Sequence, residues 1–445
     1  MSEATYRKSV TPSGITLVTE QVEGRRSVAL GVWVRCGARD EPFERLGISH
    51  FIEHMMFKGT ERRDARAIAQ SLESLGGHLD AFTAREQVCY FARALAEHIE
   101  PVVDVVSDIV CCSRFASTEV EREKSVVREE IFACEDDPED KINELLSGQM
   151  WGEHPLGRPI LGTPETVSGL DPDSLRDYFR RRYRPENLVV AATGALEHER
   201  VAELVAGHFR PPDGEGLPLS GPPPAFTPSV VHASRAGLQQ LYLSLGTRGL
   251  PYADDRRFAL VVLHTLLGGG MSSRLFQSVR EEAGLAYSVY SAADFHRDAG
   301  MFSIHLGVSP GRAREALKRL REELQALCDT GPTEEEVEAA RGQIRGGLLM
   351  SQESVTSRMY QLAHDELYHG RFVPLDEQVG HILAVTREEV EEAARAFVKP
   401  ERFALTALGP EESERLTERD WPCDPAAASS GPRVTGDGPQ TSSMT

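Results

Sequence analysis

Residues 45–59 read RLGISHFIEHMMFKG, and this stretch decides how the rest of the chain is interpreted. Its apolar residues recur at helical spacing, which predicts an amphipathic helix that stops near Gly59. On a helix, His50 and His54 are four residues apart, so both imidazoles face the same side. The carboxylate of Glu53 lies next to that pair.

Two imidazole nitrogens and one carboxylate oxygen are a common ligand set for catalytic zinc, with water in the fourth position. A nearby carboxylate such as Glu53 is suited to take a proton from that water. The pattern therefore requires one more oxygen ligand from elsewhere in the chain. The alternative is that His50 and His54 are two ordinary histidines, hydrogen-bonded on a half-buried helix.

The acidic segment 119–140, EVEREKSVVREEIFACEDDPED, is a candidate source of the missing ligand. Its composition predicts a helix, on which Glu123 and Glu130 are two turns apart and share a face. Most carboxylates on acidic helices are simply solvated, so the segment alone leaves the third ligand open.

The combination resembles a known family. HxxEH followed 76 positions later by a glutamate in a VVxEEI-like context is similar to the signature of the inverted zincins, the pitrilysin and insulin-degrading-enzyme group of metallopeptidases. The branch that it resembles most is the mitochondrial processing peptidase and its bacterial single-chain relatives. The resemblance implies one Zn²⁺ per chain, held by His50, His54 and Glu130, with Glu53 as the general base. It also implies that Glu123 orients a ligand and tunes its basicity.

Residues 76–90, GGHLDAFTAREQVCY, resemble the stretch GGxxNAxTxxExTxY of the same family. There, an edge strand near the metal receives the substrate as an added strand, which gives affinity without reading much sequence. The resemblance thus implies four substrate-binding residues: Asp80, Ala81, Phe82 and Thr83. Two positions depart from the pattern, since Asp80 replaces the usual Asn and Val88 the usual Thr. Asp80 either favours a basic residue in the substrate or marks a subgroup.

The segment 156–167, LGRPILGTPETV, also resembles a loop of the family, and the resemblance extends over residues 10–420. In the second half of the chain, Arg280 and Tyr287 match an Arg and a Tyr that reach across to the zinc of the other half. Such donors stabilise the negative charge that peptide hydrolysis builds on the substrate carbonyl. Without the resemblance, they would be read as a surface arginine and a core tyrosine.

The segment 210–228, RPPDGEGLPLSGPPPAFTP, divides the chain because its prolines and glycines cannot continue a helix or a central strand. Both halves then follow the order strand, helix, helix, strand pair, helix, which indicates an internal duplication. We expect an α+β protein with two homologous tandem α/β sandwich domains. The expected boundaries are 1–210 for the zinc-binding domain, 211–229 for the linker, 230–422 for the second domain and 423–445 for a disordered tail.

The second half lacks HxxEH and has a lone His264 on an apolar helix, which we interpret as a hydrogen-bonded core residue. Gly268, Gly269 and Gly270 are followed by no Walker lysine and do not match GxGxxG, so they form no phosphate loop.

The net charge of −20 argues against nucleic acid as a partner and against anionic membrane surfaces. No apolar run approaches the length of a membrane span, and the first residues, MSEATYRKSVTPSG, do not resemble a signal peptide. The seven cysteines, an odd number without CxxC spacing, favour reduced thiols in a reducing compartment. A cytoplasmic location is therefore expected.

Together these features predict a zinc-dependent endopeptidase that acts on unfolded peptides. The resemblance implies that two chains pair into a clamshell, and a homodimer is expected because one chain carries both the metal half and the Arg–Tyr half. The main alternative is a non-catalytic or partner-dependent subunit of a peptidase-like complex. A zinc amidase or esterase for small molecules is a third, and manganese or cobalt would also suit nitrogen and oxygen ligands.

Overall fold

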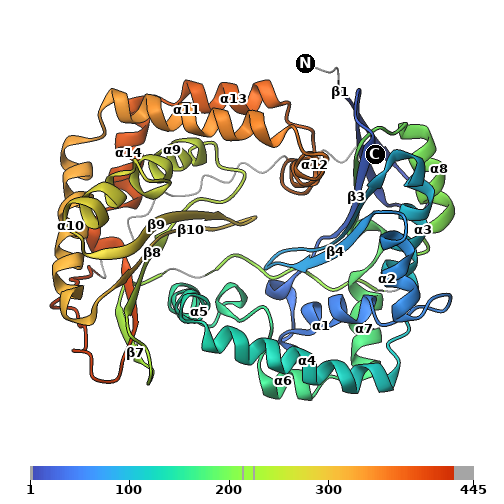
Figure 1. The fold of residues 1–445 in the computed structure, drawn as a ribbon, viewed down its shortest axis with the longest axis horizontal. Coiled ribbons are helices and arrows are strands. Elements are labelled where there is room, and N and C mark those ends of the chain that lie inside the picture. The colour runs from blue at the N-terminus through green and yellow to red at the C-terminus, as the bar shows by residue number, and fades with distance from the viewer. Residues whose placement is uncertain (1–3, 213–214, 224–225, 425–445) are drawn as a thin grey trace, which may run out of the picture.

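The computed structural model describes residues 4–212, 215–223 and 226–424, and its main feature is a pair of β-sheets that carry helices on their faces (Figure 1). The first sheet has the strand order β1-β2-β6-β3-β5-β4. Only the β2–β6 pair in it is parallel. Its strands are β1 (Ala4–Val10), β2 (Thr16–Val22), β3 (Ser27–Val34), β4 (His78–Thr83), β5 (Val88–Leu95) and β6 (Leu188–Gly194).

The second sheet has the order β7-β11-β8-β10-β9, with β7 and β11 parallel. Its strands are β7 (Val230–Ser234), β8 (Leu241–Arg248), β9 (Ala286–Phe295), β10 (Gly300–Val308) and β11 (Ala404–Gly409). Apart from β1, the two sheets have the same order and the same position of the parallel pair. This agreement supports the internal duplication inferred from the sequence, and the α+β class is confirmed.

Each sheet packs one face against helices of its own half, and these two layers hold the largest buried clusters. The helices of the first half are α1 (Ile48–Met56), α2 (Ala65–Glu73), α3 (Ile99–Cys112), α4 (Ser117–Asp136), α5 (Pro138–Trp151), α6 (Pro164–Ser168), α7 (Pro172–Arg182) and α8 (His198–His208). Those of the second half are α9 (Arg257–Gly268), α10 (Ala313–Thr330), α11 (Glu334–Ser351), α12 (Val355–His369), α13 (Leu375–Ala384) and α14 (Arg387–Phe397).

The two halves exchange one helix each, as Figure 1 shows for α5 beside β8 and α12 beside β3. Met359 and Leu362 of α12 are buried against Trp33 on the second face of the first sheet. Leu146 and Met150 of α5 are buried on the corresponding face of the second sheet. Strands β3 and β6 are consequently buried on both faces, which explains their nearly continuous apolar sequence.

Two glycines permit this close approach of the exchanged helices. A Cβ at Gly31 in β3 would meet the ring of Trp33 at 2.5 Å and the sulfur of Met359 at 3.2 Å. A Cβ at Gly246 in β8 would meet Leu146 and Met150 of α5, each at 2.9 Å. Any side chain at either position would therefore push the exchanged helix away from the sheet.

The observed elements differ from the predicted ones in two places. The acidic segment 119–140 is not one helix, because Pro138 starts a new helix that the side chain of Asp137 caps. In the second half, the second helix of the expected order is a π-helical segment, Phe276–Glu282. The proposed tail falls almost wholly on residues 425–445, outside the described residues, as do linker residues 213–214 and 224–225. Within the described ranges, no helix is long and apolar enough to cross a membrane.

Candidate metal centre

The helix that carries the HxxEH motif, α1, is fixed at its N-terminus by a buried carboxylate and a tight loop contact. Glu41 accepts hydrogen bonds from the backbone N–H groups of Gly47 at 2.7 Å and Ser49 at 2.8 Å. Gly47 has φ +85°, and a Cβ there would lie 2.4 Å from the carbonyl oxygen of Leu161. The loop 156–167, singled out in the sequence, therefore packs directly on the start of α1.

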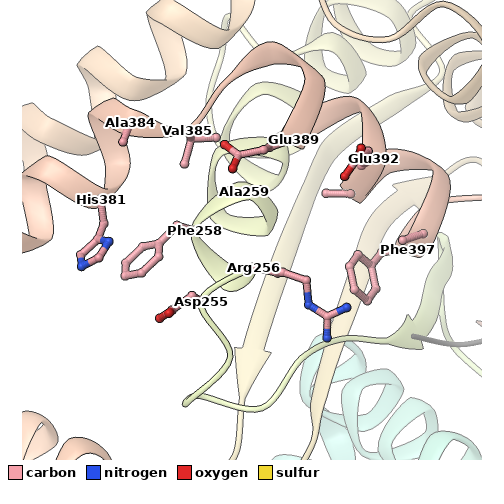
Figure 2. Close-up of a pocket in the computed structure, with 12 residues that line it drawn as sticks. Asp255, Arg256, Phe258, Ala259, His381, Ala384, Val385, Glu389, Glu392 and Phe397 are labelled. Carbon is pink, nitrogen blue, oxygen red and sulfur yellow. The ribbon is translucent and has the colours of Figure 1, made fainter. Parts of the chain in front are cut away.

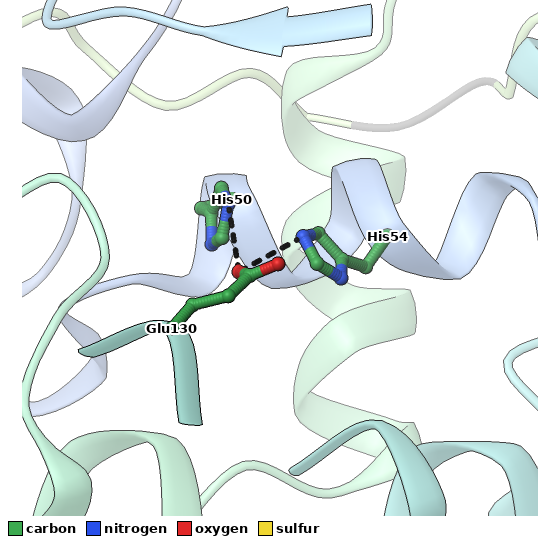
Figure 3. Close-up of side chains that lie close together, drawn as sticks. All are labelled: His50, His54 and Glu130. Carbon is green, nitrogen blue, oxygen red and sulfur yellow. Dashed lines mark ion pairs between the residues drawn. The ribbon is translucent and has the colours of Figure 1, made fainter. Parts of the chain in front are cut away.

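The structure brings His50, His54 and Glu130 together, as Figure 3 shows. Each offers one ligand atom, and these atoms all lie within 4.8 Å of one another. A carboxylate oxygen of Glu130 lies 3.7 Å from Nε2 of His50 and 3.4 Å from Nε2 of His54. The two histidines share one face of α1, as their spacing predicted, and the carboxylate comes from α4, as the family resemblance implied.

The protonation of His50 suits a metal ligand. Its Nδ1 atom is buried without a hydrogen-bond partner among the described residues, while Nε2 faces Glu130. Burial, together with the neighbouring His54, lowers the pKa of His50 to about 3, so the imidazole is neutral at physiological pH. Two imidazole nitrogens and a carboxylate are a donor set that zinc accepts readily, and the residues present therefore fit that ion.

His54 is held by Glu123, the one buried carboxylate of α4. Nδ1 of His54 lies 2.8 Å from one oxygen of Glu123, and Nζ of Lys58 lies 2.8 Å from the other. Burial alone raises the pKa of Glu123, but the hydrogen bonds from His54 and Lys58 outweigh it and lower that pKa overall. The ionised carboxylate accepts a hydrogen bond from Nδ1 of His54, so Nε2, which faces Glu130, is the ring nitrogen placed to bind a metal ion.

Glu53 lies on the same helix and is oriented by the edge strand β4. The hydroxyl of Thr83 donates a hydrogen bond to the Glu53 carboxylate at 2.5 Å. Burial is the main cause that raises the pKa of Glu53, and this hydrogen bond opposes it. A carboxylate with a raised pKa is a better proton acceptor than an exposed one.

His50 and Glu53 open onto a pocket of about 500 Å³. The sequence reasoning missed several residues that line it, although Asp140 and Glu144 are four apart on α5 and so share a face. Arg85, also in the lining, donates to the carbonyls of Leu156 and Arg158. The remaining lining residues are Ala81, Phe82, Thr83, Ile131, Cys134, Asn143, Ser147 and Pro159–Gly162.

Three of the four predicted substrate-binding residues, Ala81, Phe82 and Thr83, line this pocket. The fourth, Asp80, is not in the lining and its side chain is 57% exposed. Strand β4 is the last strand of its sheet, so one of its edges has no strand partner within the described residues. Such an edge offers backbone groups to an added strand.

Arg280 and Tyr287 lie side by side, with the guanidinium carbon 5.3 Å from the Tyr287 ring centre. Tyr287 is 77% exposed, and within the described chain neither residue lines the metal pocket. Among the described residues, the contacts found for Arg280 are with Tyr287, Phe276 and Glu281, and none of them joins the pair to the metal ligands. His264 is hydrogen-bonded through Nδ1 to Ser291 at 2.8 Å, as expected of a core histidine.

A second cavity of about 430 Å³ lies in the second half, between the start of α9 and helices α13 and α14 (Figure 2). Phe258 and Phe397 form part of its apolar wall, and the ring of His381 stacks on Phe258 at 4.6 Å. Glu389 and Glu392 lie on its rim. The group His50, His54 and Glu130 remains the one convergent metal-ligand set in the described part of the chain.

Comparison with known proteins agrees with this geometry. Residues 16–164 match the family model described as insulinase (peptidase family M16), and residues 169–344 match the model described as the peptidase M16 inactive domain. A Mycobacterium leprae protein is 39% identical over 417 residues, which are 93% of each chain. The chain belongs to peptidase family M16.

Other M16 relatives support this. A Bacillus subtilis protein is 39% identical over 89% of this chain and 97% of its own, and both it and the Mycobacterium leprae protein are named uncharacterized zinc proteases. A protease structure from Helicobacter pylori has the same fold, with a TM-score of 0.85 and 19% identity over 91% of this chain and 99% of that one. The family and the fold expected from HxxEH and the later glutamate are thus confirmed.

Proposed function

We propose that this M16 chain is a zinc-dependent endopeptidase that cleaves unfolded peptides. The observation that carries the proposal is the convergence of His50, His54 and Glu130, with the carboxylate of Glu53 lining the same pocket as His50. The edge of β4 beside that pocket favours an extended peptide over a small amide or ester.

In this proposal, a zinc ion held by the three ligands supplies positive charge that polarises the scissile carbonyl and lowers the pKa of water. Glu53 takes a proton from the attacking water and passes it to the leaving amine. The hydroxyl of Thr83 keeps the Glu53 carboxylate aimed at the pocket. Asp80, Ala81, Phe82 and Thr83 would pair with the substrate backbone and hold the scissile bond at the metal.

We also propose that the working unit is a homodimer. Arg280 and Tyr287 are neighbours but do not line the metal pocket of their own chain. A second copy facing the first would supply this pair to the substrate carbonyl, where hydrogen-bond donors stabilise the developing charge. Two chains that face each other in this way would enclose a chamber that folded proteins cannot enter.

The test is mass spectrometry of short, unstructured basic peptides incubated with the purified full chain and zinc, beside the Glu53→Gln variant. We expect cleavage by the wild-type protein, at least about 100-fold slower cleavage by the variant, and loss of cleavage with a chelator. The zinc content of the two proteins should be equal. Cleavage that survives both Glu53→Gln and chelation would refute the proposed mechanism.

The second candidate is a subunit that needs a different partner chain to complete its site. Among the described residues, no contact joins Arg280 or Tyr287 to the metal ligands, and this favours a second chain at the site over an enzyme complete in one chain. It predicts bound zinc but no cleavage of any peptide by the purified chain alone.

A further inference from the structure

Glu86 belongs to the stretch that the sequence singled out, yet the proposed chemistry gives it no role. It lies in the turn 84–87 that joins β4 to β5, the hairpin whose edge would receive the substrate. The turn 296–299 occupies the same place in the second sheet, between β9 and β10. The β9–β10 hairpin points toward the β4 region in Figure 1.

The carboxylate of Glu86 is where these two turns meet. It is 7% exposed and accepts hydrogen bonds from Arg39 at 2.6 Å, from the backbone N–H of Arg297 at 3.0 Å and from the hydroxyl of Tyr368 at 3.2 Å. Arg39 belongs to the first half, Arg297 to the β9–β10 turn and Tyr368 to α12. Two of the three donors therefore come from the second half of the chain.

Two arginines and three carboxylates form the ion-pair network around Glu86. Arg39 is fully buried, and its second terminal nitrogen lies 2.6 Å from Asp298. The guanidinium of Arg297 lies 2.9 Å from Asp40 and donates to Ser220 of the linker. Because most of this network is buried, moving the turn would leave charged groups without their partners, which opposes such a movement.

Arg85, the residue before Glu86 in the same turn, is also held by hydrogen bonds. Besides its two bonds to backbone carbonyls, Arg85 donates to the hydroxyl of Ser147 on α5 at 3.0 Å. The anchored turn begins directly after Thr83, the residue that bonds Glu53. The anchored turn 84–87 therefore fixes the position of β4 relative to the carboxylate of Glu53.

We propose that Glu86 is a positioning residue through which the second half fixes the register of the substrate strand against the metal centre. This inference rests on the proposed peptidase function. A substrate strand pairs with the edge of β4, so a shift of β4 moves the peptide past the metal. A slip by one residue would bring a different bond to the metal and turn every side chain to the opposite face.

The experiment uses Tyr368→Phe in the full chain, which removes one donor to Glu86 while the ring remains stacked on Tyr252 at 4.3 Å. Tyr6→Phe is the matched control, since the Tyr6 ring also stacks across the two halves, on Phe372, away from the turn. For Tyr368→Phe we expect a KM about tenfold higher, kcat within about twofold, and cleavage spread over neighbouring bonds. Zinc content should not change. Cleavage sites and KM equal to those of the control would overturn the proposal.

A second readout does not depend on cleavage. In the Glu53→Gln background, added peptide should slow hydrogen exchange of the backbone amides in residues 78–83. When Tyr368→Phe is introduced as well, about tenfold more peptide should be needed for the same protection. If wild-type protein cleaves nothing but this difference is seen, the peptidase function fails and the positioning role stands. Equal protection with and without Tyr368→Phe would overturn the positioning role.

Discussion

Glu123 accepts a hydrogen bond from Nδ1 of His54 at 2.8 Å, and this contact decides which nitrogen of His54 faces Glu130. In the proposed metal centre, Glu123 would therefore act through His54 rather than on the metal itself. The same carboxylate is paired with Lys58 at 2.8 Å, so its charge remains compensated inside the protein.

We predict that Glu123→Gln weakens zinc binding by about 10- to 100-fold, because the amide stabilises the required tautomer of His54 less well. Activity should recover when zinc is added in excess. Glu121→Gln is the control, since Glu121 is an exposed residue of the same helix that pairs with Lys124. Competition for zinc with a chelator of known affinity measures the effect. Equal affinity in both variants would show that the His54–Glu123 contact has no influence on the metal.

A homodimer with shared sites predicts complementation between two inactive variants. Glu53→Gln removes the base, and Tyr287→Phe removes the donor that the facing chain would supply. When the two variants are mixed and allowed to re-pair, about half of the dimers contain one chain of each variant, and each of these dimers has one intact site. Activity should therefore return to about a quarter of the wild-type value. Peptide cleavage after mixing is the measurement. If the mixture stays as inactive as its components, each site must take Tyr287 from its own chain or not at all.

Asp140 lines the metal pocket, whereas the other pocket carboxylate of α5, Glu144, already pairs with Lys141 at 3.0 Å. We predict that Asp140→Asn lowers kcat/KM for peptides with a basic residue near the cleavage site by about threefold to tenfold. Neutral peptides should be cleaved as before, and added salt should reduce the difference. The control is Glu139→Gln, a neighbouring exposed residue that does not line this pocket. A uniform loss for basic and neutral peptides would contradict an electrostatic role.

Asp365 of α12 makes the stability of the fold depend on pH. Burial raises its pKa to about 7, while the backbone N–H of Val373 donates to its carboxyl. Because the folded pKa exceeds that of the unfolded chain, this group stabilises the fold at low pH, and the contribution is lost as pH rises from about 4 to about 7.

The Asp365→Asn variant keeps the acceptor for Val373 but does not titrate. Relative to wild type, its free energy of unfolding should therefore increase between pH 5 and pH 8, by at most about 3 kcal/mol. Denaturant unfolding at the two pH values tests this, with the exposed Asp376→Asn as control. Parallel pH profiles for wild type and Asp365→Asn would be inconsistent with a buried titrating carboxyl.

The metal centre was predictable because its information is local. Two histidines four residues apart on an amphipathic helix must share a face of that helix. Glu123 and Glu130 must likewise share a face of the second helix. What remained was to bring two helices together, and the family resemblance supplied that step. The break at Pro138 was also visible in the sequence, since proline favours the first turn of a new helix over the interior of an old one.

The exchange of α5 and α12 was not predictable in the same way. A helical pattern identifies an apolar face but does not say which sheet that face will cover. The network around Glu86 could not be predicted for a similar reason, because the hydrogen bond between Glu86 and Tyr368 joins residues 282 positions apart in the chain. Contacts of this kind depend on how the two halves dock, which no local pattern of residues records.

The measurement that tests the central claim most directly is X-ray absorption spectroscopy at the zinc edge on the purified protein, together with its zinc content. The account predicts one zinc ion per chain with nitrogen and oxygen ligands at about 2.0–2.1 Å and no sulfur, and loss of that ion in Glu130→Ala. A chain without zinc would contradict it. So would a zinc–sulfur distance of about 2.3 Å, which would show that a cysteine such as Cys134 is a ligand.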